Sequence, residues 1–159
     1  MPKPHTLTWA TPTHYADLAD VIYDAVRNGP SKYTEAQRAL WVPERRGGEE
    51  WAARLDRQTI AIACDANRIV GFMSLETGGY IDFAYIRPEA QGTGLFRRLF
   101  AQIEAQARAI SETRLWTHAS LMTEPAFAAV GFEVIERQIV QIGGESFKRA
   151  KMELMLSKA

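Results

Sequence analysis

The stretch YIDFAYIRPEAQGTGLFRRLF, from Tyr80 to Phe100, changes from one apolar pattern to another within a few residues. Its first part, 80–86, is rich in aromatic and β-branched side chains, which is typical of a strand. From 95 to 110 the apolar residues recur with helical spacing. The residues on that apolar face are Phe96, Leu99, Ile103, Ala107 and Ile110. We therefore predict a strand, a glycine-rich turn over RPEAQGTG (Arg87 to Gly94) and a long amphipathic helix.

A glycine-rich turn between a strand and a helix presents backbone amides at the positive end of the helix. Such a turn can bind a phosphate or pyrophosphate, and Gly92 and Gly94 would let the ligand approach the main chain. A basic patch beside the turn is expected from Arg87, Arg97 and Arg98. A Walker loop would need Gly-Lys-Ser/Thr, which is absent, and a dinucleotide fold would need a third glycine where Arg97 stands.

The segments on either side of this stretch predict a mixture of strands and helices. Upstream, we expect a strand at 7–10, helices at 12–28 and 34–41, a helical turn carrying Trp51 and Leu55, and a hairpin of 59–64 with 68–76 around Asp65-Ala66-Asn67. Downstream, we expect a strand at 115–119, a helix at 123–130 and a final hairpin around Gly143-Gly144. The prediction is one α+β domain over 1–159, with a mostly antiparallel, mixed sheet of about seven strands flanked by about four helices.

Composition excludes several classes of protein. The 19 Lys and Arg residues balance the 19 Asp and Glu residues, which argues against a dedicated nucleic-acid binder. The single cysteine, Cys64, cannot form an internal disulfide, and one cysteine with three histidines makes a poor metal site, so we expect no metal. No apolar run reaches the roughly 18 residues of a membrane helix, and the N-terminus lacks the apolar segment of a signal peptide. We expect a cytoplasmic protein that binds no membrane.

At the glycine turn the sequence resembles the GNAT superfamily of acyl-CoA-dependent N-acyltransferases. That family has a strand ending in Val or Ile, a Pro two residues later, and Gln/Arg-x-x-Gly-x-Gly/Ala at a helix start. The matching residues are Ile86, Pro88, Gln91 and Gly94. A second family signature, an aromatic residue before a Gly-Phe pair, matches Phe127 with Gly131-Phe132. The resemblance covers almost the whole chain and extends to one bacterial subgroup of the family.

The resemblance implies acetyl-CoA as the cosubstrate and transfer of its acetyl group to a primary amine, by direct attack in a ternary complex. It places the pyrophosphate on the amides of 92–96 and the pantetheine arm beside 84–86. The implied cofactor-binding residues are Ala84, Ile86, Gln91, Gly92, Thr93, Gly94, Leu95, Phe96, Arg97, Ser120 and Phe127. Phe96 replaces a small residue of the family, and its place on the apolar helix face predicts that it points into the core.

Acetyl transfer needs a neutral amine, and removing the proton from an amine of pKa near 10 at pH 7 costs about 4–5 kcal/mol. A base is therefore useful; Asp82 is the first candidate and His118 the second. The family's Tyr that protonates the thiolate is matched by Phe127, which has no proton, so water or a hydroxyl of Tyr85 or Ser120 would serve instead. An amide near residue 84 or 85 would stabilise the oxyanion.

The acceptor amine is expected between the first two helices and the final hairpin. The predicted lining is Tyr33, Trp41, Tyr85 and the loop ERRGGEE (44–50), with Glu35, Glu49, Glu50 and Asp82 as partners for a cationic amine. The alternative to an enzyme is a non-catalytic acyl-CoA sensor, which Phe96 and Phe127 motivate. A homodimer is plausible because the final hairpin leaves an open edge strand.

Overall fold

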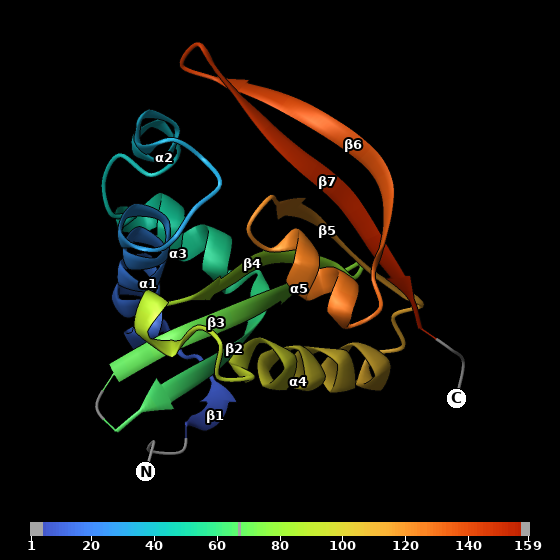
Figure 1. Cartoon of the computed structure of the whole chain (residues 1–159). Helices are drawn as coiled ribbons and strands as arrows, with labels where there is room; N and C mark the ends of the chain where they lie inside the picture. Colours follow the sequence, from blue (N-terminus) through green and yellow to red (C-terminus); the bar gives the residue numbers. More distant parts are fainter. Residues whose placement is uncertain (1–4, 67, 157–159) are drawn as a thin grey trace.

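The chain folds around one seven-stranded sheet whose strands follow the order β1-β2-β3-β4-β5-β7-β6 (Figure 1). The computed structural model describes residues 5–66 and 68–156. The strands are β1 (Thr6–Trp9), β2 (Gln58–Asp65), β3 (Arg68–Glu76), β4 (Tyr80–Ile86), β5 (Arg114–Ser120), β6 (Glu133–Ile142) and β7 (Glu145–Met155). All neighbouring strands are antiparallel except β4 and β5, which are parallel. The predicted α+β architecture is confirmed; Asn67 of the predicted β2–β3 turn lies outside the described residues.

The described part of the chain contains five α-helices, where about four were expected. They are α1 (Tyr15–Asn28), α2 (Glu35–Trp41), α3 (Gly48–Asp56), α4 (Leu95–Ala109) and α5 (Glu124–Ala129). The predicted start at Pro12 is a separate 3-10 turn, Pro12–His14. The helical turn expected at Trp51 extends into α3 because Trp51 and Leu55 are both buried. None of the described helices is long and apolar enough to cross a membrane.

The helices cover the two faces of the sheet in separate groups (Figure 1). On one face, Leu18 of α1 and Leu55 of α3 pack with Phe72 of β3. On the other, Leu99 of α4 and Phe127 of α5 pack in a second core cluster. Burying apolar surface on both faces provides the main driving force for this arrangement.

β4 and β5 pair only at their beginnings and then separate. The paired positions are Tyr80 with Trp116 and Ile81 with Thr117. A bulge follows on β4, where the register against β3 shifts and the Phe83 amide donates to the Ser74 hydroxyl at 3.0 Å. Because no strand of the described residues pairs with β4 on its β5 side after Ile81, the main chain of 84–86 borders an opening in the sheet.

The last strand in the sheet, β6, is largely exposed and carries apolar side chains. Ile139 is 64% exposed and Ile135 is 45% exposed. Such an edge is a place where a second copy could pair, and the homodimer stays a prediction.

Candidate active site

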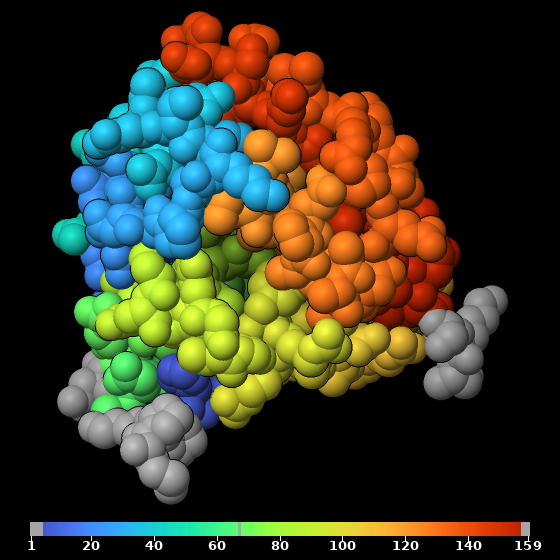
Figure 2. Space-filling model, in the orientation of Figure 1, coloured from blue at the N-terminus to red at the C-terminus, as the bar shows by residue number. Residues whose placement is uncertain are grey.

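The opening between β4 and β5 is a cavity of about 380 Å³. Figure 2 shows it as a hollow between the α1–α2 segment, the loop after β4 and α5. The end of β4 and the start of α4 form its floor, and residues from 25 to 41 and from 120 to 130 form its walls. The cavity therefore lies where β4 passes through the glycine-rich turn into α4.

The glycine turn forms one end of the cavity and is shaped to receive an anion. Gly92 and Gly94 have φ angles of +75° and +80°, and Gly94 is the N-cap of α4. A Cβ added to either glycine would meet no atom within 4 Å, so space lies over both. Among the described residues, none accepts a hydrogen bond from the amides of 92–96. The turn thus combines free donors with the positive end of the helix dipole.

Side chains beside the glycines hold the turn in shape. The Gln91 amide donates to the Ile86 carbonyl at 3.0 Å, and the Thr93 hydroxyl donates to the Ala90 carbonyl at 2.6 Å. Gln91 also lines the cavity, whereas Thr93 does not. Leu95 is buried and borders the cavity from the first turn of α4.

Only one arginine of the expected basic patch lines the cavity. Arg97 does so, and it donates to the Ala129 carbonyl at 3.2 Å. The expectation for Arg87 is wrong: its side chain is 5% exposed, and its guanidinium is bound by Asp20 at 2.8 Å and Asp24 at 3.1 Å of α1. Arg98 does not line the cavity either. Arg87 instead fastens α1 to the sheet.

A channel leads from the turn along the end of β4. Ala84 and Ile86 line one side of it, and Ser120 with Thr123 lines the other. The Ser120 hydroxyl also accepts from the Thr123 amide at 3.2 Å, so it caps the turn into α5 as well.

The two phenylalanines of interest pack together near this channel. Phe127 does not line the cavity; it is 1% exposed and meets Phe96 edge to face, with ring centroids 5.0 Å apart. Phe96 packs against the core as predicted and also borders the cavity. Neither ring fills the turn itself.

The three predicted catalytic residues do not lie together, and only Tyr85 lines the cavity. Its ring packs on Phe72 and Phe83, and burial raises the pKa of the Tyr85 hydroxyl to about 12. The Tyr85 hydroxyl forms no hydrogen bond with any of the described residues. Tyr85 is therefore protonated at neutral pH and free to donate.

Asp82 is occupied by other side chains. Its carboxylate is 7% exposed, accepts from Arg54 at 2.7 and 2.8 Å and from Gln58 at 2.8 Å, and does not line the cavity. The bulge on β4 and the position of α3 bring these partners together.

His118 also lies away from the cavity, where its Nδ1 is 3.0 Å from the Tyr80 hydroxyl. Burial, with the charges of Arg149 and Lys151, lowers the pKa of His118, so the ring is neutral at pH 7.

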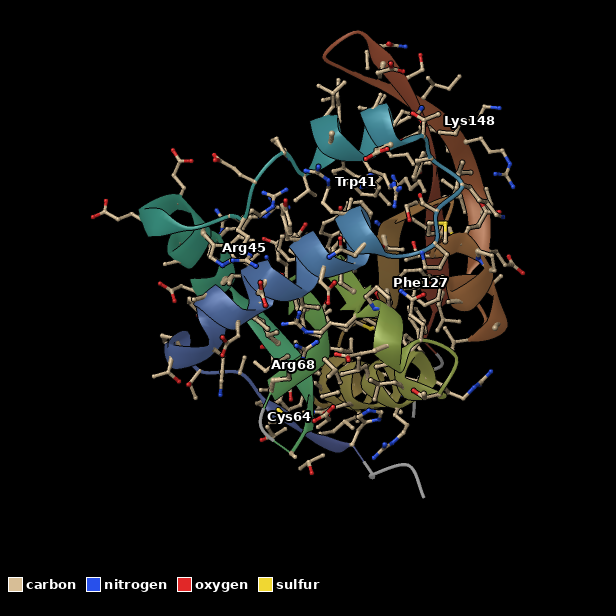
Figure 3. The ribbon with its side chains drawn as sticks, turned by 60° about the vertical axis from the view of Figure 1, so that its left-hand side comes forward. Trp41, Arg45, Cys64, Arg68, Phe127 and Lys148 are labelled. Atoms are coloured by element: carbon tan, nitrogen blue, oxygen red, sulfur yellow. The ribbon has the colours of Figure 1, made fainter. Side chains whose placement is uncertain are left out.

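The far end of the cavity is aromatic. Tyr33 and Trp41 line it as predicted, and together with Phe147 of β7 they form an aromatic cluster in which Trp41 meets both other rings edge to face. The Tyr33 hydroxyl donates to the Lys148 carbonyl at 2.6 Å. In Figure 3, Trp41 is labelled between α2 and α1, and Lys148 is labelled on the β6–β7 hairpin. These contacts place the aromatic end of the cavity between the first helices and the final hairpin, and its use as the acceptor site stays a prediction.

The charges at this end differ from those expected. Glu35, Glu49, Glu50 and Asp82 do not line the cavity, whose charged wall residues are Arg38 and Arg97. Residues 44–47 and Glu50 of the predicted loop line a neighbouring groove of about 470 Å³ that shares Trp41. Arg38 was not singled out from the sequence, although its i, i+3 spacing from Trp41 places both on one face of α2. No cluster of potential metal ligands occurs among the described residues.

Comparison with known proteins agrees with this geometry. The model of the acetyltransferase (GNAT) domain matches residues 30–154. A GCN5-related N-acetyltransferase of Rhodopseudomonas palustris is 28% identical, with a TM-score of 0.85 and coverage of 98% of both chains. PaiA N-acetyltransferase of Thermoplasma acidophilum, solved with coenzyme A, is 13% identical, with a TM-score of 0.71 and coverage of 96% of this chain and 99% of that one.

A further similar structure is a GNAT phosphinothricin acetyltransferase of Sinorhizobium meliloti, solved with acetyl-CoA. It is 17% identical, with a TM-score of 0.69 and coverage of 97% of this chain and 89% of that one. Among proteins of curated function, none matches the sequence significantly.

Proposed function

Because the chain belongs to the GNAT family and is an acetyl-CoA-dependent N-acetyltransferase, we propose that it acetylates a primary amine by direct attack on the thioester in a ternary complex. The observation that carries this proposal is a single cavity that joins the free amides of the glycine turn to Tyr85 and the aromatic acceptor end. A cavity open to both substrates allows attack without a covalent enzyme intermediate. Cys64, the one thiol, does not line it.

Acetyl-CoA would be held by main-chain groups more than by side chains. The amides of 92–96 would receive the pyrophosphate, with Arg97 adding charge. The pantetheine arm would extend along 84–86 as an additional strand, in the gap that β5 leaves, and Ser120 would contact its amide. The acetyl carbonyl would then lie near Tyr85, which lines the same stretch of cavity.

Tyr85 would act as a hydrogen-bond donor to the leaving group. Its pKa of about 12 exceeds that of an ordinary thiol, near 8.5, so full proton transfer to the thiolate would be uphill by about 5 kcal/mol. Donation without transfer still stabilises the developing negative charge, and water then supplies the proton.

Tyr85→Phe is expected to lower kcat by about 10- to 100-fold, because it removes one donor to that charge. The Kd for acetyl-CoA should change little, since the ring and its packing remain. Stopped-flow thiol release and calorimetry measure the two quantities. An unchanged kcat would remove Tyr85 from the mechanism.

The amine would lose its proton to water, because no carboxylate or imidazole of residues 5–66 and 68–156 lines the cavity. The rate would then rise with pH until the amine itself is neutral. Asp82 and His118 stay predictions as bases; each would need a chain of waters to reach the cavity.

Asp82→Asn separates a structural role from a catalytic one. Losing the partner of Arg54 should lower the free energy of unfolding by about 1–3 kcal/mol, below the range for a fully buried pair because Arg54 is 37% exposed. Thermal melts of this variant, of Arg54→Gln and of the double variant measure the coupling. A large loss of kcat with an unchanged Tm would instead make Asp82 the base.

A non-catalytic sensor would bind acetyl-CoA and release no thiol with any amine. Titration with acetyl-CoA followed by a thiol assay over an amine panel distinguishes the two functions. Thiol release that depends on the amine supports the enzyme, and binding without release supports the sensor.

A further inference from the structure

Arg38 is the charged residue at the acceptor end of the cavity, and its guanidinium is only partly used. Nη1 donates to the Gly29 carbonyl at 2.9 Å and to the Val26 carbonyl at 3.4 Å. Nε is buried and has no hydrogen-bond partner among the described residues. A buried donor left unpaired is costly, and the side chain belongs to the cavity wall. The structure therefore presents, in the wall of the cavity, a cationic side chain with an unpaired donor.

No carboxylate of the described residues forms an ion pair with Arg38 or lines the cavity. The nearest carboxylate to Tyr85 along β4, Asp82, is held by Arg54 and Gln58. Arg46, in the groove that shares Trp41, lies over Trp51 and Phe83 at 5.8 and 6.0 Å, and no described acid forms an ion pair with it. Glu44 and Glu50 line that neighbouring groove as well. Among the described residues, however, the charged side chains that line the cavity are Arg38 and Arg97, which disfavours a dication such as a polyamine there.

The remaining wall of the acceptor end is apolar and aromatic. Tyr33 is fixed by its bonds to the Lys148 carbonyl and the Leu121 amide, and Trp41 and Met122 line the cavity beside it. A rigid apolar wall with one cation favours a small ligand that has an apolar body and one anionic group.

We propose that the acceptor is a small primary amine that also carries a carboxylate, and that Arg38 binds this carboxylate. Tyr33, Trp41 and Met122 contact the apolar part, so that the amine faces the thioester beside Tyr85. This inference rests on the proposed function and adds the chemical class of its substrate. A planar guanidinium suits a carboxylate because it can donate two parallel hydrogen bonds.

The test compares acceptors that differ only in the carboxylate. Apolar amino acids with α-, β- and γ-amines are assayed with acetyl-CoA against their amides and decarboxylated amines. Each rate is divided by the fraction of the acceptor whose amine is unprotonated at the assay pH, because the amine of an amino acid and that of its amide differ in pKa. For at least one series, kcat/KM should be about tenfold or more higher for the acid, as expected for a charge-assisted pair.

Arg38→Gln should reduce that preference to about twofold or less, and Arg38→Lys should restore part of it. The matched control is Arg27→Gln. Arg27 of α1 also donates to main-chain carbonyls, those of Val42 at 3.0 Å and Pro43 at 3.3 Å directly after α2, but does not line the cavity. This control should keep the wild-type preference whatever it does to Tm.

Two results would overturn the proposal. One is equal or faster turnover of the amides and decarboxylated amines by the wild type, and the other is an equal loss for acid and amide in Arg38→Gln, which would assign Arg38 a purely structural role. Both leave amine acetylation intact. Absence of thiol release with every amine would instead contradict the proposed function itself.

Discussion

Gly94→Val should weaken acetyl-CoA binding by at least about 100-fold. Gly94, the N-cap of α4, has a φ of +80° and open space where a side chain would stand. An isopropyl group there would occupy the volume over the free amides of 92–96 and prevent the pyrophosphate from reaching them. Loss of several charge-assisted hydrogen bonds accounts for a change of this size.

Gly78→Val is the matched control, because Gly78 also has positive φ, +98°, and open space, yet lies in the β3–β4 turn away from the cavity. Both variants should lose about 1–3 kcal/mol of stability to backbone strain. Only Gly94→Val should lose binding in a calorimetric titration. Equal affinities in the two variants would mean that acetyl-CoA does not use this turn.

Arg87→Met should destabilise the fold more than any of the other substitutions, by about 2–4 kcal/mol. It removes a buried guanidinium that bonds Asp20, Asp24 and the Ile69 carbonyl and leaves two acids close together. The expected fall in Tm is about 5–12 °C. Arg45→Met is the control, because Arg45 bonds the same Asp20 but is 65% exposed, so its loss should cost less than about 1 kcal/mol. Similar melting curves for the two variants would contradict this role for Arg87.

The same cluster predicts how stability depends on pH. Burial by itself would raise the pKa of Asp24, but hydrogen bonds from Asn28 and Arg87 outweigh it and hold the pKa below its usual value. A carboxyl with a lowered folded-state pKa stabilises the fold above its unfolded pKa, near 3.9, and this stabilisation is lost as the pH falls through the folded value. Urea unfolding between pH 6 and pH 3 should show this loss in the wild type and a smaller one in Asp24→Asn. Parallel curves would exclude Asp24 as a source of acid sensitivity.

The elements that the sequence predicted well are those determined by local patterns. The strand at 80–86, the helix from Leu95 and the capping box of Thr34 and Gln37 all depend on residues within a few positions of one another. Side chains whose partners lie far along the chain were harder to predict. Arg87 is bound by α1, more than 60 positions earlier in the chain. Its position next to the glycines in the sequence therefore does not reveal the direction of its side chain.

The catalytic candidates show the same limit. Alternation along an ideal strand does not anticipate the bulge at Phe83, and spacing alone does not show that Arg54 would occupy Asp82. Tyr85, Tyr33 and Trp41 line the cavity that the family resemblance implies, while their roles in catalysis and acceptor binding stay predictions. Arg38 could have been found by extending the face of α2 that carries Trp41.

Transfer of an acetyl group from acetyl-CoA to an amine within this cavity can be measured directly. The purified protein is incubated with isotope-labelled acetyl-CoA and an amine panel, and free CoA thiol and N-acetyl product are quantified together. We expect equal amounts of thiol and labelled amide, and neither product with Gly94→Val at the same acetyl-CoA concentration. Tight binding of acetyl-CoA with no amide from any acceptor, or thiol release that Gly94→Val does not diminish, would contradict acetyl transfer at this site.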